Sequence, residues 1–314
     1  MNTINKTAFI FPGQGAQYPG MGKDVYDKYP EARAVYEKAD DALNFSISRR
    51  CFEGPEEELK LTENTQPAIL TTSIALLRVL QKYIDIRPDF VAGHSLGEYS
   101  ALVCSEALTF EDAVVSVQKR GKFMQESLPP GTGTMAAVIK ISEEKVRELC
   151  GRVSHEGHIV VNANINCPGQ YVISGHTEAV QEVSELAKAA GAITIPLAVS
   201  APFHSPLMKK AADELENWLK KISFNDLKIP LITNATTEII HTAAEAGTSL
   251  VQQMQAPVKW EASVRKLIAN GAGTFVEIGP GKVLSGLLKR IDRSVNILHV
   301  SDIPSLENAV KNLK

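Results

Sequence analysis

One five-residue segment has the spacing of a serine nucleophile. Gly93-His94-Ser95-Leu96-Gly97 matches the pattern G-x-S-x-G, with a short apolar run before it and a helical pattern after it. Glycines two residues to either side let the backbones pass at a sharp strand-to-helix turn. The serine hydroxyl is then exposed at the start of a helix, where negative charge is favoured. The segment predicts that Ser95 is a nucleophile; the alternative is an ordinary turn serine.

A serine hydroxyl needs a neighbouring base, and His204 is the histidine whose surroundings fit best. It lies in the loop Ser200-Ala201-Pro202-Phe203-His204-Ser205-Pro206, which two prolines restrict between a predicted strand and a predicted helix. The remaining histidines fit surface or packing positions better: His94, His155, His158, His176, His241 and His299.

The third member of a hydrolase-type triad is missing from the sequence pattern. An Asp or Glu is expected between the serine and the histidine in chain order. Glu111 and Asp112 fall in that interval, but they have the pattern of helix-capping residues. Either a backbone carbonyl orients the imidazole or an acid does so that the pattern does not identify.

Two other positions could bind negative charge. Gln14, in the glycine-flanked loop after the first predicted strand, could direct its backbone N–H at an oxyanion together with the N–H of Leu96. The alternative at Gln14 is a tight turn that needs a positive φ. Arg120 falls among lysines in a helix that begins near Phe110, and on its own this pattern indicates a solvated basic face.

Strand-like and helix-like runs alternate through most of the chain, which favours a mostly parallel sheet covered on both faces. Short apolar runs at 7–11, 88–95, 274–279 and 297–300 predict strands. Residues 66–83, 96–103 and 281–291 have helical spacing, and Pro67 suits a first helical turn. We assign residues 1–130 and 199–314 to this α/β domain.

Residues 131–198 break that alternation and predict a small inserted domain. Strands are expected at 134–140, 158–164, 170–175 and 193–198, with helices at 142–152 and 177–190 and a turn at 166–169. The order β-α-β-β-α-β is that of a ferredoxin-like α+β unit.

Composition excludes several classes of function. The 314 residues include 33 Lys+Arg and 36 Asp+Glu, a net charge of −3, so we expect no nucleic-acid or membrane partner. The first residues lack a signal-peptide core. Four scattered cysteines indicate a reducing compartment and no metal site. We expect a cytoplasmic monomer.

Six segments together resemble the malonyl-CoA:acyl carrier protein transacylases over nearly the whole chain. They are FPGQGAQ (11–17), GHSLGEYSAL (93–102), Arg120-Gly121 with Phe123-Met124-Gln125, PFHS (202–205), PVKW (257–260) and EIGPGKVL (277–284). The resemblance implies a hydrolase-like large domain with the ferredoxin-like domain inserted. It also implies transfer of malonyl from malonyl-CoA to the phosphopantetheine thiol of holo acyl carrier protein, with no cofactor.

The resemblance assigns roles to named residues. Ser95 would accept the acyl group, His204 would be the base, and the main-chain carbonyl of Gln253 would orient it. Arg120 would bind the malonyl carboxylate, and the N–H groups of Gln14 and Leu96 would form the oxyanion hole. Met124 and Phe203 would line the acyl pocket, and Asn162 and Asn164 would contact the pantetheine arm. For the two asparagines, strand-end capping is the alternative. A polyketide acyltransferase, a serine thioesterase and a non-catalytic scaffold are the rival functions.

Overall fold

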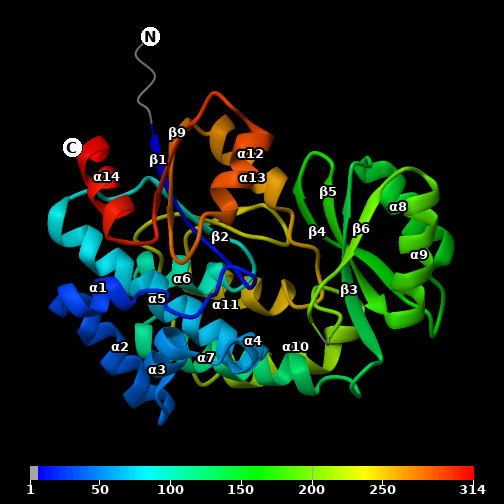
Figure 1. Cartoon of the computed structure of the whole chain (residues 1–314), viewed down its shortest axis with the longest axis horizontal. Coiled ribbons are helices and arrows are strands. Elements are labelled where there is room, and N and C mark those ends of the chain that lie inside the picture. The colour runs from blue at the N-terminus through cyan, green and yellow to red at the C-terminus, as the bar shows by residue number, and fades with distance from the viewer. Residues whose placement is uncertain (1–5, 200) are drawn as a thin grey trace.

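The computed structural model describes residues 6–199 and 201–314 and contains two sheets. Figure 1 shows the larger sheet among most of the helices, and the smaller sheet at the right with two helices beside it. Ser200 of the histidine-containing loop and residues 1–5, where the sequence predicts no signal peptide, lie outside the described part.

The larger sheet has six strands in the order β10-β9-β1-β2-β7-β8. All neighbours are parallel except the antiparallel pair β7 and β8. The strands are β1 (Lys6–Phe11), β2 (Phe90–Gly93), β7 (Leu231–Ile232), β8 (Ile239–Ile240), β9 (Ala272–Ile278) and β10 (Asn296–Val300). The carboxyl ends of β1 and β2 lie side by side, because Phe11 pairs with Gly93. Two loops of the predicted site therefore start from one edge of the sheet.

The alternation of side chains along β1 divides the core of this sheet into two layers. Phe9 and Phe11 pack in the cluster that contains α2, α5 and α7, whereas Ala8 and Ile10 pack against α12 and α13 on the other face. The helices of this part are α1 (Lys23–Lys28), α2 (Pro30–Leu43), α3 (Ile47–Glu53), α4 (Glu56–Lys60), α5 (Thr62–Tyr83), α6 (Gly97–Cys104), α7 (Phe110–Glu126), η1 (Pro206–Met208), α10 (Lys209–Leu219), α11 (Ala243–Gln252), α12 (Trp260–Ala269), α13 (Val283–Ile291) and α14 (Ile303–Leu313).

The smaller sheet is antiparallel, in the order β4-β5-β3-β6. Its elements are β3 (Gly133–Ile139), α8 (Glu143–Val153), β4 (Val160–Cys167), β5 (Gln170–His176), α9 (Thr177–Ala189) and β6 (Ile193–Pro196). One face packs on α8 and α9 in a core of its own. From the other face Met135, Ala163 and Val172 join the core of the larger part. The fold class read from the sequence, a mostly parallel α/β sheet with a ferredoxin-like α+β unit, is confirmed.

Several element boundaries differ from the sequence prediction by a few residues, and two of these differences bear on named features. The helix expected from residue 66 begins at Thr62, so Pro67 lies inside α5 and not in its first turn. The turn expected at 166–169 is shorter, because β4 continues to Cys167. The polar side chains Asn64, Thr65 and Gln66 are buried in the first turns of α5, which hides this start from an apolar pattern.

No helix within the described residues is long and apolar enough to cross a membrane. The same part of the chain contains no group of three or more His, Cys, Asp or Glu side chains that could hold a metal ion.

Candidate active site

The predicted nucleophile lies on a sharp turn between β2 and α6. Ser95 has a φ of 53°, a left-handed conformation that is strained for a residue with a side chain. The flanking glycines are required by close backbone contacts. A Cβ on Gly93 would lie 1.9 Å from the carbonyl carbon of Gly97, and one on Gly97 would lie 2.2 Å from the carbonyl oxygen of Phe11. The strand, turn and helix predicted from G-x-S-x-G are all present.

His204 is in contact with the serine. Its Nε2 lies 2.8 Å from Ser95 Oγ, and its Nδ1 lies 2.7 Å from the main-chain oxygen of Gln253. Because a carbonyl only accepts hydrogen bonds, Nδ1 carries the proton and Nε2 is free to accept the hydroxyl of Ser95. Burial, and then the charge of Arg120, lowers the pKa of His204 to about 3, so the ring is neutral at physiological pH.

A carbonyl takes the position that a triad acid has in many serine hydrolases. Gln253 follows directly on the last residue of α11, and its main-chain oxygen is the partner of His204 Nδ1. Asp112, by contrast, lies in the first turn of α7, where its backbone N–H bonds to Thr109 Oγ1. Of the two alternatives that the sequence left open, the structure contains the carbonyl.

The helical pattern on its own predicted that Arg120 lies on a solvated basic face, and this prediction is wrong. Its side chain is 1% exposed, and burial lowers its pKa. Its Nη2 donates to Ser95 Oγ and to Gln253 Oε1, both at 3.0 Å, and its Nη1 donates to Gln66 Oε1 at 2.8 Å. Within the described residues it forms no ion pair, and its Nε has no hydrogen-bond partner. A buried guanidinium whose hydrogen-bond partners are all neutral is suited to a small anion.

The predicted oxyanion residues lie beside Ser95. Gln14 and Leu96 line the same cleft, and within the described residues no acceptor is found for either backbone N–H. The Ser95 carbonyl accepts from Glu98 N–H inside α6, at 3.0 Å. In a trans peptide the N–H points opposite to the C=O, so Leu96 N–H points out of the helix start. The tight turn considered for Gln14 is also present, with its positive φ at Gly15.

The cleft around these groups has a volume of about 90 Å³. Apolar side chains line it together with the polar groups: Met124, Met135, Leu197, Val199 and Phe203. Asn164 also lines the cleft, but Asn162 does not. Both asparagines lie inside β4, so strand-end capping was the wrong alternative, and neither Oδ1 has a partner among the described residues.

The sequence matches known proteins over its whole described length. The model of the acyl transferase domain family matches residues 8–312. The malonyl CoA-acyl carrier protein transacylase of Bacillus subtilis (strain 168) is 49% identical over 312 residues, covering 99% of this chain and 98% of that protein. This chain belongs to the acyl transferase family.

Other members of the acyl transferase family agree in sequence and in fold. The malonyl CoA-acyl carrier protein transacylase of Staphylococcus aureus (strain MRSA252) is 43% identical, covering 98% of this chain and all of that protein. The solved transacylase of Coxiella burnetii has a TM-score of 0.96 at 39% identity, covering 99% and 98% of the two chains. A malonyl-transacylase solved with its type II PKS acyl-carrier protein has a TM-score of 0.95 at 42% identity, covering 98% and 100%.

Besides the lining residues Met135, Leu197 and Val199, three polar residues around the acyl transferase site were not singled out from the sequence. Gln66 bonds to Arg120, Asn234 bonds to the turn that carries Ser95, and Glu98 bonds to Asn234. Burial raises the pKa of Glu98 to about 7, although hydrogen bonds from Ser249 and from the Asn234 backbone act in the opposite direction. Glu98 lies in the GHSLGEYSAL segment, and its position one helical turn after Ser95 was the available signal.

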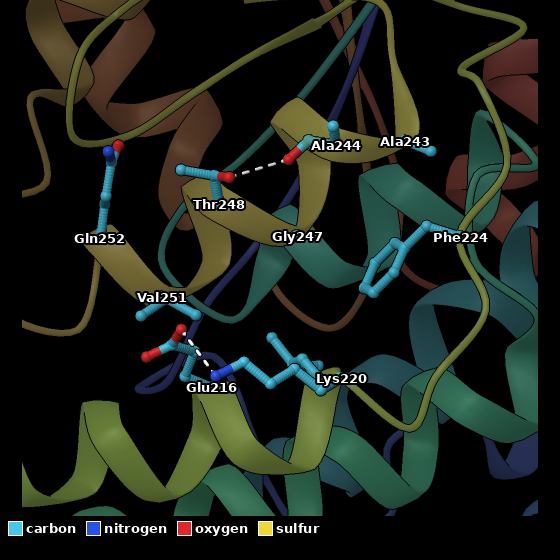
Figure 2. Close-up of a pocket in the computed structure, with 10 residues that line it drawn as sticks. Glu216, Lys220, Phe224, Ala243, Ala244, Gly247, Thr248, Val251 and Gln252 are labelled. Atoms are coloured by element: carbon cyan, nitrogen blue, oxygen red, sulfur yellow. Dashed lines mark hydrogen bonds and ion pairs between the residues drawn. The ribbon is translucent and has the colours of Figure 1, made fainter.

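A second, larger hollow lies between α10 and α11 (Figure 2). Its lining consists of aliphatic side chains, Phe224 and the exposed side of α11, where Thr248 donates to the Ala244 carbonyl. Lys220 and Glu216 form an ion pair at its edge, 3.0 Å apart. None of the histidines lines it, and its one carboxylate, Glu216, is paired with Lys220.

Proposed function

We propose that this chain transfers malonyl from malonyl-CoA to the phosphopantetheine thiol of holo acyl carrier protein, through a malonyl-serine intermediate, in fatty acid biosynthesis. The observation that best supports this is the buried Arg120, whose Nη2 lies 3.0 Å from Ser95 Oγ. An acyl group on Ser95 is thus within reach of a guanidinium that has no carboxylate partner at ion-pair distance among the described residues, although the charge of the buried Glu98 acts on it. The free carboxylate of a malonyl group supplies that partner, whereas an acetyl group does not.

The first step forms the acyl-serine. His204 Nε2 takes the proton of Ser95, and Oγ forms a bond to the thioester carbon of malonyl-CoA. The N–H groups of Gln14 and Leu96 stabilise the oxyanion of the tetrahedral intermediate. The carbon–sulfur bond then breaks, and CoA leaves with the proton from His204.

The second step is the reverse reaction with a different thiol. His204 takes the proton of the phosphopantetheine thiol, whose sulfur attacks the malonyl-serine ester. The bond to Oγ breaks, and His204 returns the proton to Ser95. Because both half-reactions share one covalent intermediate, ping-pong kinetics are expected.

The malonyl carboxylate also affects the base. In the free protein the nearby charge of Arg120 is the second cause, after burial, of the lowered pKa of His204. A carboxylate bound to Arg120 offsets that charge, so the imidazole becomes a stronger base when malonyl is present. Catalysis is then favoured for the acyl group that has a carboxylate.

The lining of the cleft supports the rest of the assignment. Phe203 and Met124 narrow the space around the acyl group, which favours malonyl over a branched acyl group by about 1–3 kcal/mol per methyl. Asn164 lines the cleft, which supports its assignment to the pantetheine arm. Asn162 is the second residue that we assign to the pantetheine arm, because its Oδ1 is buried and has no partner in the described part of the chain.

Intact-protein mass spectrometry after mixing with malonyl-CoA tests the proposal, with Ser95→Ala as the control. A malonyl adduct that is absent in the variant and that holo acyl carrier protein removes faster than water supports a transferase. Rapid release of malonate without transfer indicates a serine thioesterase. Absence of any adduct from malonyl-, methylmalonyl- or acetyl-CoA indicates a non-catalytic scaffold.

A polyketide pathway is the second candidate, because one structural neighbour is solved with a type II PKS acyl-carrier protein. Comparing transfer to carrier proteins of the two pathways distinguishes them.

We also propose that residues 1–130 and 199–314 form one domain and residues 131–198 a second, and that the protein is a cytoplasmic monomer. The cysteines of the described chain are all unpaired, and the proposed machinery is complete within one chain.

A further inference from the structure

Asn234 lies two residues beyond β7, the strand that pairs with β2, and its side chain contacts the turn that follows β2. It is 2% exposed. Its Oδ1 accepts from Ser95 N–H at 2.6 Å, and its Nδ2 donates to the Gly93 carbonyl at 2.6 Å. The amide thus bonds to the backbone of the serine and to the backbone of the glycine two residues earlier.

We propose that Asn234 is a positioning residue for the nucleophile: its amide holds the Gly93–Ser95 turn in the conformation that presents Ser95 Oγ to His204. The proposal rests on the proposed function, because it concerns formation of the acyl-serine. Asn234 does not contact the reacting atoms; it acts through the backbone of Ser95.

The strained backbone of Ser95 is the reason that the hydrogen bonds of the Asn234 amide matter for the position of Oγ. Ser95 has a positive φ, and a serine leaves that region unless its surroundings hold it there. The two bonds of Asn234 satisfy a donor and an acceptor that the turn itself leaves unpaired. Without them, the turn can relax toward a more favourable φ, which moves Oγ away from Nε2. The same bonds occupy Ser95 N–H, so that Leu96 N–H is the donor left for the oxyanion.

Asn234 is itself held rigidly. Its N–H donates to Glu98 Oε2 at 3.0 Å, and its carbonyl accepts from Lys259 N–H at 3.0 Å. Glu98 is fully buried on α6, and its Oε1 accepts from Ser249 Oγ on α11 at 2.8 Å. Ser249 lies one turn before Gln253, whose carbonyl bonds to His204. The network therefore connects the turn of the nucleophile to the helix end that orients the base.

Asn234→Ala and Asn234→Asp test the proposal, with Thr236→Ala as the matched control. Thr236 is exposed in the same loop, and its hydroxyl bonds to Thr233 Oγ1 and not to the nucleophile turn. The first-turnover rate of Ser95 malonylation is measured by rapid quench and mass spectrometry. For Asn234→Ala we expect a rate about 100-fold below that of the wild type with an unchanged KM for malonyl-CoA, the result of misplacing a reacting group by about 1 Å. Thr236→Ala should react at the wild-type rate.

Asn234→Asp adds a readout that a role in folding alone would not produce. A protonated aspartic acid has one donor and one acceptor, like the asparagine amide, whereas the carboxylate has no donor for the Gly93 carbonyl. Burial beside Glu98 favours protonation. The rate of this variant, divided by the wild-type rate at the same pH, should therefore rise as the pH falls.

The outcomes separate this inference from the proposed function. If the wild type forms no malonyl-serine, the proposed function fails. If the wild type reacts and Asn234→Ala reacts equally fast, or the deficit of Asn234→Asp does not change with pH, the positioning role is wrong. If Asn234→Ala does not fold, the pH dependence of Asn234→Asp decides the question.

Discussion

The candidate active-site cleft and the groove between α10 and α11 are both hollows of this chain, yet they differ in size and in chemistry. The cleft has a volume of about 90 Å³ and the groove about 440 Å³. In the groove Glu216 pairs with Lys220, and the Thr248 hydroxyl donates to the Ala244 carbonyl (Figure 2). In the cleft, Arg120 Nε and Asn164 Oδ1 are buried without partners among the described residues.

This difference shows that the volume of a hollow does not locate the chemistry of this protein. Unpaired buried polar groups cost free energy, and a ligand in the cleft could pair the ones that lie there. Backbone strain is also found at the cleft, where both Ser95 and His204 have a positive φ. The groove has an ordinary helical lining. Four measurements test whether the two regions differ as described.

The largest effect is expected at the nucleophile. Ser95→Ala removes the atom proposed to form the acyl bond, so kcat should fall by on the order of a million-fold. Steady-state transfer of malonyl to carrier protein measures it. Val251→Ser, in the lining of the groove, is the control and should leave kcat unchanged. Comparable losses in both variants would contradict the distinction between the regions.

Arg120→Gln is expected to have the next largest effect. Loss of one partner of a buried charge pair costs about 2–5 kcal/mol, so malonyl transfer should fall roughly 30- to 5,000-fold. Acetyl transfer, which involves no carboxylate, should change far less. Lys122→Ala removes a charge from the exposed side of the same helix and should have no effect. Equal losses for both acyl groups would mean that Arg120 acts on Ser95 alone.

A pair of glycine substitutions compares the backbones of the two regions. Gly93→Ala places a Cβ 1.9 Å from backbone and should lower the free energy of unfolding by about 3 kcal/mol or more. Gly247→Ala, in α11 beside the groove, meets only Phe224 at 3.9 Å and should raise it by about 0.5–1 kcal/mol. Urea unfolding measures both. An unchanged free energy of unfolding in Gly93→Ala would contradict the close backbone contact at this turn.

The smallest expected effect concerns the charge environment of the base. The pKa of His204 lies near 3, below its ordinary value of 6.5, because of burial and the charge of Arg120. Arg120→Gln removes the second cause, so the pKa of His204 should rise and the ring should protonate at a higher pH than in the wild type. A carbon-13 NMR titration of the imidazole detects this. An unchanged pKa of His204 would mean that the charge of Arg120 is not one of the causes.

Arg120 shows how a pattern can be present and still be misread. Val117, Arg120, Gly121 and Met124 follow the i, i+3, i+4, i+7 spacing of a buried helical stripe, and all four are buried. The flanking lysines, Lys119 and Lys122, made the segment resemble a solvated face. Only the resemblance to the transacylases pointed to a carboxylate-binding role for Arg120. The spacing would have supported a buried position.

Other parts of the fold were predictable to different degrees. The β-α-β-β-α-β order of the small sheet followed from short alternating runs and turn residues, which are local features. The start of α5 was not predictable, because its first turns are polar residues buried by tertiary contacts. The irregular pairing between Asn162 and Asn164 in β4 could not be read from the sequence either.

The sequence by itself determined the strained serine turn, the loop of His204 and the alternation of elements, because each depends on neighbours in the chain. The tertiary structure alone decided which groups meet. Ser95 and His204 are 109 residues apart, His204 and Gln253 49 residues apart, and Ser95 and Asn234 139 residues apart. Parallel strands bring their carboxyl ends to one edge of a sheet whatever the length of chain between them, and this accounts for Ser95 after β2 and Asn234 after β7. His204 and Gln253 follow no strand of that sheet and meet only through tertiary packing, and no residue type marks the Gln253 carbonyl in the sequence.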